Sequence, residues 1–150
     1  MHDLAGKICG IILAFVLVVI MPFVNVAVEN EMLDRRLIIN EITTFIDGVV
    51  DSRQITDSMI NELNVSLAKY GISVDYDITR YARSVNNDPL SDGDYYVTYM
   101  KVDDNTTYRK GDKISVHVYS IGYSGSISLA HRLSGIFTGD LDVILTARIR

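Results

Sequence analysis

The side chains that most often carry out chemistry in proteins are scattered in this sequence. The three histidines are His2, His117 and His131, and none of them lies at metal-ligand spacing from another histidine, a cysteine or a carboxylate. The apolar positions around His117 alternate with it, which places its imidazole on the solvent side of a strand. The sequence therefore predicts neither a metal site nor a bound cofactor.

Residues 122–126 read GYSGS, which comes close to the G-x-S-x-G turn that exposes a nucleophilic serine in hydrolases. Ser124 departs from that pattern because Gly125 follows it directly, and no strand-to-helix turn with acid and base partners surrounds it. With no other catalytic arrangement in the chain, we expect that the protein is not an enzyme.

An acidic turn at residues 88–94 holds three aspartates and a glycine, which together could bend around a calcium ion. Pro89 interrupts the turn, and the long bidentate acid of the helix–loop–helix calcium pattern is missing. We interpret the segment as a solvated turn, with calcium binding as the alternative.

The charge balance bounds the class of partner. The chain has 150 residues and a net charge of −5, and from Glu29 onward 13 Lys and Arg residues stand against 18 Asp and Glu residues. Nucleic-acid binding requires a basic surface that displaces counterions from phosphate, so no nucleic-acid partner is expected. Cys9 is the only cysteine, which rules out an intramolecular disulfide.

The segment from Ile8 to Val28 carries no charge and predicts a transmembrane helix. A helix of this length spans roughly 31 Å, which is the thickness of the hydrocarbon layer. Pro22 removes one helical hydrogen bond and predicts a kink or a loosened turn. Lys7 on one side and the Arg35–Arg36 pair on the other oppose each other, so charge alone leaves the orientation open.

Helical spacing continues beyond the membrane edge and then gives way to alternation. Apolar residues from Leu37 to Val49 recur every three to four positions, which predicts an amphipathic stem helix that ends at about Gly48 or Val50. Residues 52–71 predict a second helix, with Thr56 or Asp57 as its N-cap and Gly71 as a left-handed stop.

Four segments then alternate with a period of two, which is typical of strands: residues 72–83, 94–102, 112–124 and 141–150. The polar connections between the first three predict an antiparallel meander, and residues 125–137 predict a short helix before the last strand. The fold class is therefore α+β: a transmembrane helix, a stem helix, a second helix and a four-stranded, mainly antiparallel sheet.

All nine tyrosines fall after residue 69, and six of them lie on the predicted strands: Tyr76, Tyr95, Tyr96, Tyr99, Tyr119 and Tyr123. Tyrosine packs well on half-buried sheet surfaces, so a structural role is the first interpretation. An adhesive face is the alternative, because rigid tyrosines also make good contact residues.

A short polar leader with glycines, an apolar helix with a proline that runs into an amphipathic stem, and a sheet domain together resemble a type IV pilin or pseudopilin. Among these, the layout is most similar to the minor pseudopilins of tight-adherence pili, the TadE/TadF type. The resemblance implies a cytoplasmic leader at residues 1–7, the transmembrane helix at 8–28 and an extracytoplasmic α+β domain at 29–150.

In that family a peptidase cuts after a glycine, and a glutamate five residues later aligns neighbouring subunits. The resemblance makes Gly6 or Gly10 the processing point, which would place Ile11 or Phe15 where the family has its glutamate. This departure favours a minor or membrane-resident subunit over the main pilin.

The resemblance also implies partners in the membrane, namely other pilin or envelope-machine subunits that contact the N-terminal helix. The first acids after the apolar segment, Glu29, Glu31 and Asp34, would meet basic groups of neighbouring subunits. The rival interpretation is an uncleaved single-pass binding subunit of a secretion or conjugation machine, whose helix stays in the bilayer.

Overall fold

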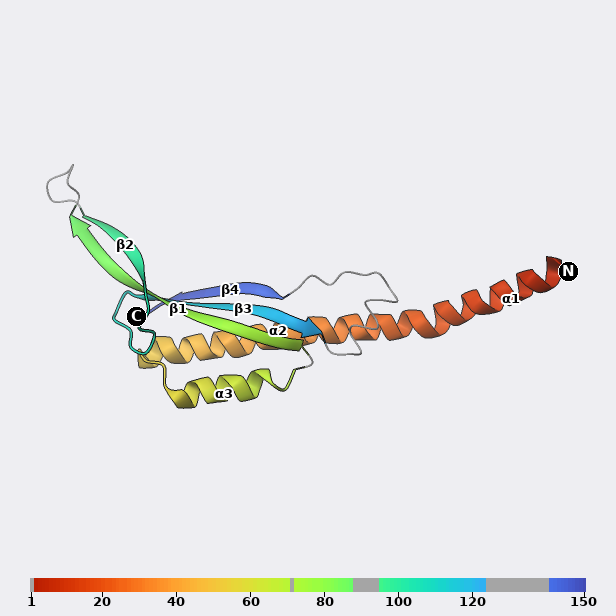
Figure 1. The fold of residues 1–150 in the computed structure, drawn as a ribbon, viewed down its shortest axis with the longest axis horizontal. Helices are drawn as coiled ribbons and strands as arrows, with labels where there is room; N and C mark the ends of the chain where they lie inside the picture. The colour runs from red at the N-terminus through yellow and green to blue at the C-terminus, as the bar shows by residue number, and fades with distance from the viewer. Residues whose placement is uncertain (1, 71, 88–94, 124–140) are drawn as a thin grey trace.

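The computed structural model describes residues 2–70, 72–87, 95–123 and 141–150. A long helix runs from the N-terminus into a domain formed by a second, short helix and a sheet, and its first half extends away from that domain (Figure 1). The α+β class and the order of helices before strands are confirmed.

The long helix is continuous from His2 to Ser52: α1 (His2–Phe15), a π-helical turn η1 (Val16–Ile20) and α2 (Met21–Ser52). It ends where Arg53 takes a left-handed conformation, with φ of 58°, so the predicted end at Gly48 or Val50 was too early. Gly48 serves packing instead. A Cβ atom there would lie 3.3 Å from the Met59 methyl group, so the glycine lets the next helix approach closely.

That next helix is α3 (Asp57–Leu67). The Thr56 side chain accepts a hydrogen bond from the Met59 N–H, which confirms the N-cap and satisfies one of the free donors of the first turn. The helix ends at Leu67, and the predicted stop at Gly71 lies outside the described residues.

The sheet consists of β1 (Ile72–Asn87), β2 (Tyr95–Val102), β3 (Lys113–Tyr123) and β4 (Asp142–Arg148), all paired antiparallel in the order β2-β1-β3-β4. The predicted meander is therefore wrong, because β3 pairs with β1 and not with β2. The first part of β1 pairs with β3 and its last part pairs with β2, so β1 and β2 form an arm that projects beyond the end of α2 (Figure 1).

A buried ion pair explains why the chain crosses back over β1 after β2. Arg80 lies at the point in β1 where the two pairings meet, and it holds Asp112, the residue just before β3, with a shortest distance of 2.8 Å. Asn105 in the same connection bonds the backbone on both sides of Thr79, donating to the Ile78 carbonyl and accepting from the Arg80 N–H. These contacts direct β3 to the opposite edge of β1.

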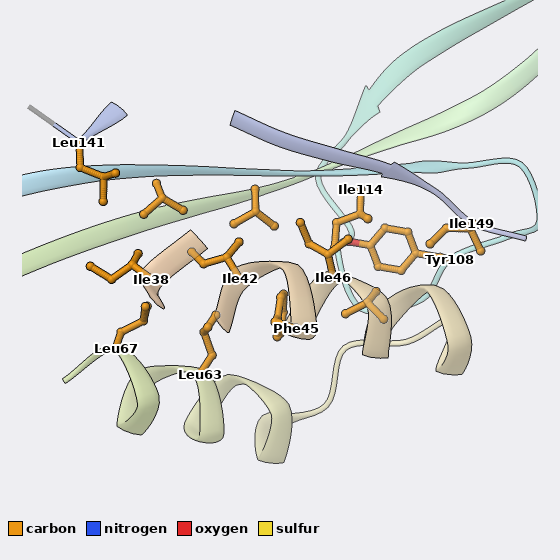
Figure 2. Close-up of a cluster of buried hydrophobic side chains, with 13 residues drawn as sticks. Ile38, Ile42, Phe45, Ile46, Leu63, Leu67, Tyr108, Ile114, Leu141 and Ile149 are labelled. Carbon is orange, nitrogen blue, oxygen red and sulfur yellow. The ribbon is translucent and has the colours of Figure 1, made fainter. Parts of the chain in front are cut away.

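The core lies between α2 and its two neighbours, the sheet and α3. Figure 2 shows Ile38, Ile42 and Ile46 of α2 below the strands, with Leu63 and Leu67 reaching up from α3. Along β4 burial alternates residue by residue, which confirms the predicted inward face. The three layers follow from the two apolar faces of α2, which pack against different partners.

Several predicted features fall on residues 88–94 and 124–140 and lie outside the described residues. They are the acidic turn, most of the GYSGS segment with Ser124, His131 and the short helix before the last strand. Each of them stays a prediction.

Candidate functional site

The N-terminal half of the long helix carries the largest exposed apolar surface of the described chain. From Leu4 to Val26 its large apolar side chains are at least 38 % exposed, except for half-buried Ile20 and buried Val24, and Leu4–Ser52 is long and apolar enough to cross a membrane. Full burial of such a side chain is worth about 1.5–3 kcal/mol, and the thirteen exposed side chains are between 38 % and 72 % exposed, so leaving the segment in water costs on the order of 10–20 kcal/mol. An apolar environment is therefore required around it.

The same helix also carries a buried line that begins well before the sheet. Val24, Glu31, Ile38 and Phe45 are all buried, and they follow one another at intervals of seven residues. Residues seven apart share one side of a helix, so this line is one continuous stripe. Glu31 interrupts the apolar stripe with a carboxylate that is 2 % exposed.

Pro22 lies two residues after the end of the π-helical turn. The Met21 N–H donates to the Val16 carbonyl, five residues back, and Pro22 has no N–H with which to continue the ordinary ladder. The loosened turn thus lies on the N-terminal side of the proline, in the middle of the exposed apolar surface. Figure 1 shows the axis of α1 turned away from that of α2.

Gly6 and Gly10 lie within α1, one turn apart. A Cβ atom at either position would meet nothing within 4 Å, so packing within the described chain requires a glycine at neither. Their role as processing points stays a prediction.

The three acids expected to contact other subunits lie in different environments. Glu29 is exposed and Asp34 is half-buried, whereas buried Glu31 accepts hydrogen bonds from Arg35 of its own chain at 2.6 and 3.1 Å. Contact with neighbouring subunits stays a prediction for all three, and Glu29 is the most accessible of them.

On the domain, β3 and β4 bring together a histidine and a carboxylate that lie 25 residues apart in the sequence. His117 Nε2 lies 2.7 Å from Asp142 Oδ1, and the side chains are 38 % and 70 % exposed. The solvent-side position expected for His117 is confirmed. In the described part of the chain no three His, Cys, Asp or Glu side chains are grouped so that they could hold a metal ion.

The Arg80–Asp112 pair is the most enclosed charged group of the domain. Asp112 accepts hydrogen bonds from the Arg80 guanidinium and from the backbone N–H groups of Arg83 and Arg109. Burial by itself would raise the pKa of Asp112, but these donors outweigh it and hold the pKa below its usual value. With its oxygens occupied, the carboxylate serves to hold the connection between β2 and β3.

Tyr108 lies beside that pair, with its ring 5.5 Å from the Arg80 guanidinium carbon. Its hydroxyl is buried and has no hydrogen-bond partner among the described residues, and burial raises its pKa to about 12. A phenol held neutral in this way suits packing and not proton transfer near pH 7.

The strand tyrosines do not share one face. Tyr76 is half-buried on the inner face and donates to Asn64 of α3, whereas Tyr119 lies on the outer face beside Asp75. Tyr95 and Tyr96 are neighbours on the arm, so they point to opposite sides of it, 68 % and 49 % exposed. Tyrosine therefore serves packing at the base of the sheet and is exposed on the arm.

A cleft of about 390 Å³ opens between α2 and α3. Phe45, Met59 and Leu63 line its floor, and Glu41 and Glu62 stand at its polar side. The Tyr70 hydroxyl already donates to Glu41 at 3.0 Å. Thr44 and Ser66 also line the cleft, and the Thr44 hydroxyl donates to the Asn40 carbonyl of its own helix.

Comparison with known proteins gives no relative: no family model, no curated protein and no solved structure matches the chain. The described residues define the architecture: one N-terminal helix long and apolar enough to span a membrane, followed by an α+β domain packed on the continuation of that helix.

Proposed function

We propose that the chain is a membrane-anchored, non-catalytic structural subunit of the minor pilin or pseudopilin type, which serves a surface pilus or a secretion assembly. Its N-terminus lies in the cytoplasm and its domain outside the cell. Its partners are the membrane and other subunits that contact the N-terminal helix, and nucleic acid is not among them.

One observation carries the proposal: a single unbroken helix is apolar on all sides in one half and packed into a domain in the other half. A membrane anchor joined to a domain by a linker would let the domain move independently. A continuous helix instead fixes the domain relative to the membrane segment, so helices that pack side by side also arrange their domains in a regular way.

Subunits can assemble if neighbouring helices replace lipid around the apolar segment. Lipid tails and apolar side chains of a neighbouring helix are similar solvents for the segment from Leu4 to Val26, so contact between helices can replace lipid at little cost. The loosened turn before Pro22 would let this half adjust to its neighbours. Exposed Glu29 follows this half, which supports a contact between its carboxylate and a cation of another subunit.

The test is the intact mass of the protein extracted from its native membrane, together with its sedimentation with sheared surface filaments. We expect a mass that begins at Lys7 or Ile11 and recovery in the filament fraction. Leucine in place of Gly6 and Gly10 should leave the full-length mass, whereas the control Ala5→Val should be processed normally. A mass that begins at Met1, with all material left in the membrane, would overturn the proposal.

One sequence feature favours a second candidate, an uncleaved envelope-anchored binding subunit of a secretion or conjugation machine. Neither Gly6 nor Gly10 is followed at the fifth position by an acid, since Ile11 and Phe15 stand there. A helix that never leaves the bilayer has no need of that acid. The unprocessed, membrane-retained outcome of the experiment above supports this candidate.

A further inference from the structure

The outer face of the sheet, which points away from α2, is ordered by charge along the strands. Cross-strand partners in an antiparallel sheet project from the same face, so the register defines rows across it. The central row is neutral and consists of Thr79 on β1, Ser115 on β3 and Thr146 on β4. The Thr146 hydroxyl donates to the Ser115 hydroxyl at 3.1 Å, so two side chains of this row bond to each other.

The rows on one side of the neutral row are acidic. Asp77 pairs with His117, and in the next row Asp75 pairs with Tyr119, which in turn pairs with Asp142. These aspartates are exposed. Coulombic repulsion from Asp75 is the main reason why the pKa of Tyr119 is raised, which reports the negative field at this end.

The row on the other side is basic. It runs Lys101, Tyr81, Lys113 and Arg148 across all four strands, and Lys113 Nζ lies 3.9 Å from the centre of the Tyr99 ring. No carboxylate stands in this row, and none of its three cations forms an ion pair within the described chain.

The two charged ends are too far apart to neutralise each other. Asp77 and Tyr81 lie four residues apart on β1, which corresponds to roughly 13 Å along an extended strand. The screening length is about 8 Å at physiological ionic strength. Each end therefore presents its own field to a partner.

The ends also lie at different heights along α2. Val118 and Val143, beside the acidic rows, border the same small internal space as Ile38. Arg148, in the basic row, shares a wide cleft with Asp47 and Asp51 near the end of α2. Since α2 continues the apolar helix, the acidic end is the one nearer the membrane and the basic end is the one farther from it.

We propose that this outer face binds a second copy of the same chain, with the basic row of one copy set against the acidic rows of the next. Two copies side by side at equal height would face like charges, which repel. A shift of roughly 13–20 Å along the strand direction, equal to four to six residues, brings opposite charges together. The contact is head-to-tail and leaves one charged end free on each copy, where a further subunit can bind.

This arrangement deepens the proposed function, because it rests on copies that share one membrane orientation. While all helices lie at one depth in the bilayer, the outer faces repel each other. Axial displacement of one copy replaces repulsion with attraction. The outer face thus favours contact between axially displaced copies over contact between copies at the same depth in the membrane.

The experiment reverses each end separately in the full-length chain, purified in a non-ionic detergent at low salt. One variant carries Lys101→Glu and Arg148→Glu, and the other carries Asp77→Lys and Asp142→Lys; all four positions are exposed. Sedimentation velocity should show that the association of each variant alone is weaker than that of the wild type by about tenfold or more. An equimolar mixture of the two should regain association, since each then offers the charge that the other needs.

A matched control for the first variant is Arg36→Glu with Lys69→Glu, which lowers the net charge by the same amount at exposed positions of α2 and α3. This control should associate like the wild type, and near-UV circular dichroism should show that all variants are folded. The proposal is overturned if the wild type stays monomeric, if the control loses association equally, or if the mixture fails to recover.

The outcome separates this inference from the proposed function. If association is unchanged in both charge variants, the outer face does not bind a second copy, but the proposal of a pilin-type subunit that assembles through its helix stands. Charge-dependent association of a chain that is unprocessed and absent from filaments would keep the face and overturn the pilin-type proposal.

Discussion

The two halves of the long helix are both helical, but they have opposite surroundings. From Leu4 to Val26 most of the large apolar side chains are exposed, whereas from Ile38 to Val49 the apolar side chains are buried against the sheet and α3. The first half can be stabilised by any apolar medium. The second half requires particular partners, because its side chains interlock with those of other elements.

This difference shows which half of the helix requires specific partners. Lipid and a neighbouring helix are interchangeable around the first half, so substitutions there should act through overall hydrophobicity. In the second half, shape and hydrogen bonding matter at each position. Substitutions in the apolar half and in the packed domain can be compared to test this contrast.

The largest effect is expected for charges in the first half. Leu17→Arg with Val18→Arg places two cations at the middle of the apolar segment, where each costs about 2.5–3.5 kcal/mol of insertion free energy. The protein should move from the alkaline-carbonate-resistant membrane fraction to the supernatant or to aggregates. Asn61→Arg with Val65→Arg adds the same charge at exposed positions of α3 and should leave membrane retention unchanged.

A double-arginine chain that stays fully resistant to carbonate would contradict the lipid dependence of this half. Loss of membrane retention in the α3 control would indicate that net charge, and not its position, decides insertion.

The next effect concerns the ion pair that holds the connection between β2 and β3. Asp112→Ala leaves Arg80 buried without its carboxylate, and breaking such a pair typically costs about 3–5 kcal/mol of unfolding free energy. Denaturant titration in detergent, followed by tyrosine circular dichroism, measures it. Asp142→Ala, at a pair with an exposed histidine, should change the unfolding free energy by less than about 1 kcal/mol. Equal losses in both variants would contradict the role of burial.

A smaller effect compares two isoleucines of the same helix. Ile42→Ala removes a fully buried side chain and should lower the unfolding free energy of the domain by about 2–4 kcal/mol. Ile11→Ala, at a side chain that is 71 % exposed, should change it by less than about 0.5 kcal/mol. The same denaturant titration checks both. A comparable loss at Ile11 would mean that the two halves unfold as one unit.

Acid should destabilise the domain but not the apolar half of the helix, because the pKa of Asp112 is low in the folded domain. Its folded pKa lies below the unfolded value of about 3.9, so the stability it contributes is fully present above that pH and is lost as the pH falls toward the folded pKa. Tyrosine circular dichroism should fall below pH 4 while the helical signal of the detergent-bound half persists. Asp112→Asn should reduce the pH dependence in this range, and an unchanged profile would contradict the assignment.

Much of the fold could be predicted because it follows from local patterns. The apolar run, the three-to-four spacing after it and the alternation from residue 72 onward define the helices and strands within a few residues. The end of α2 was placed too early because the apolar spacing stops at Val49, whereas the helix continues to Ser52. Gly48 lies within the helix, and its missing side chain makes room for Met59. Sequence shows the glycine but not the neighbour that requires it.

Strand order and the polar contacts could not be predicted, because they join residues far apart in the chain. The Arg80–Asp112 pair spans 32 residues, and the His117–Asp142 contact spans 25. The charge order of the outer face was missed for the same reason. Asp77 and Arg148 belong to one pattern only after the register aligns β1, β3 and β4.

The sequence by itself determined that this protein has a helix able to span a membrane, a stem that continues it and a sheet with one apolar face, since periodicity and length follow from the geometry of single elements. The tertiary structure alone decided that β1 is central and that Glu31 is buried in the stripe of α2. It also decided that the outer face is acidic at one end and basic at the other. Pairing between distant segments depends on their mutual fit, which no single stretch of sequence contains.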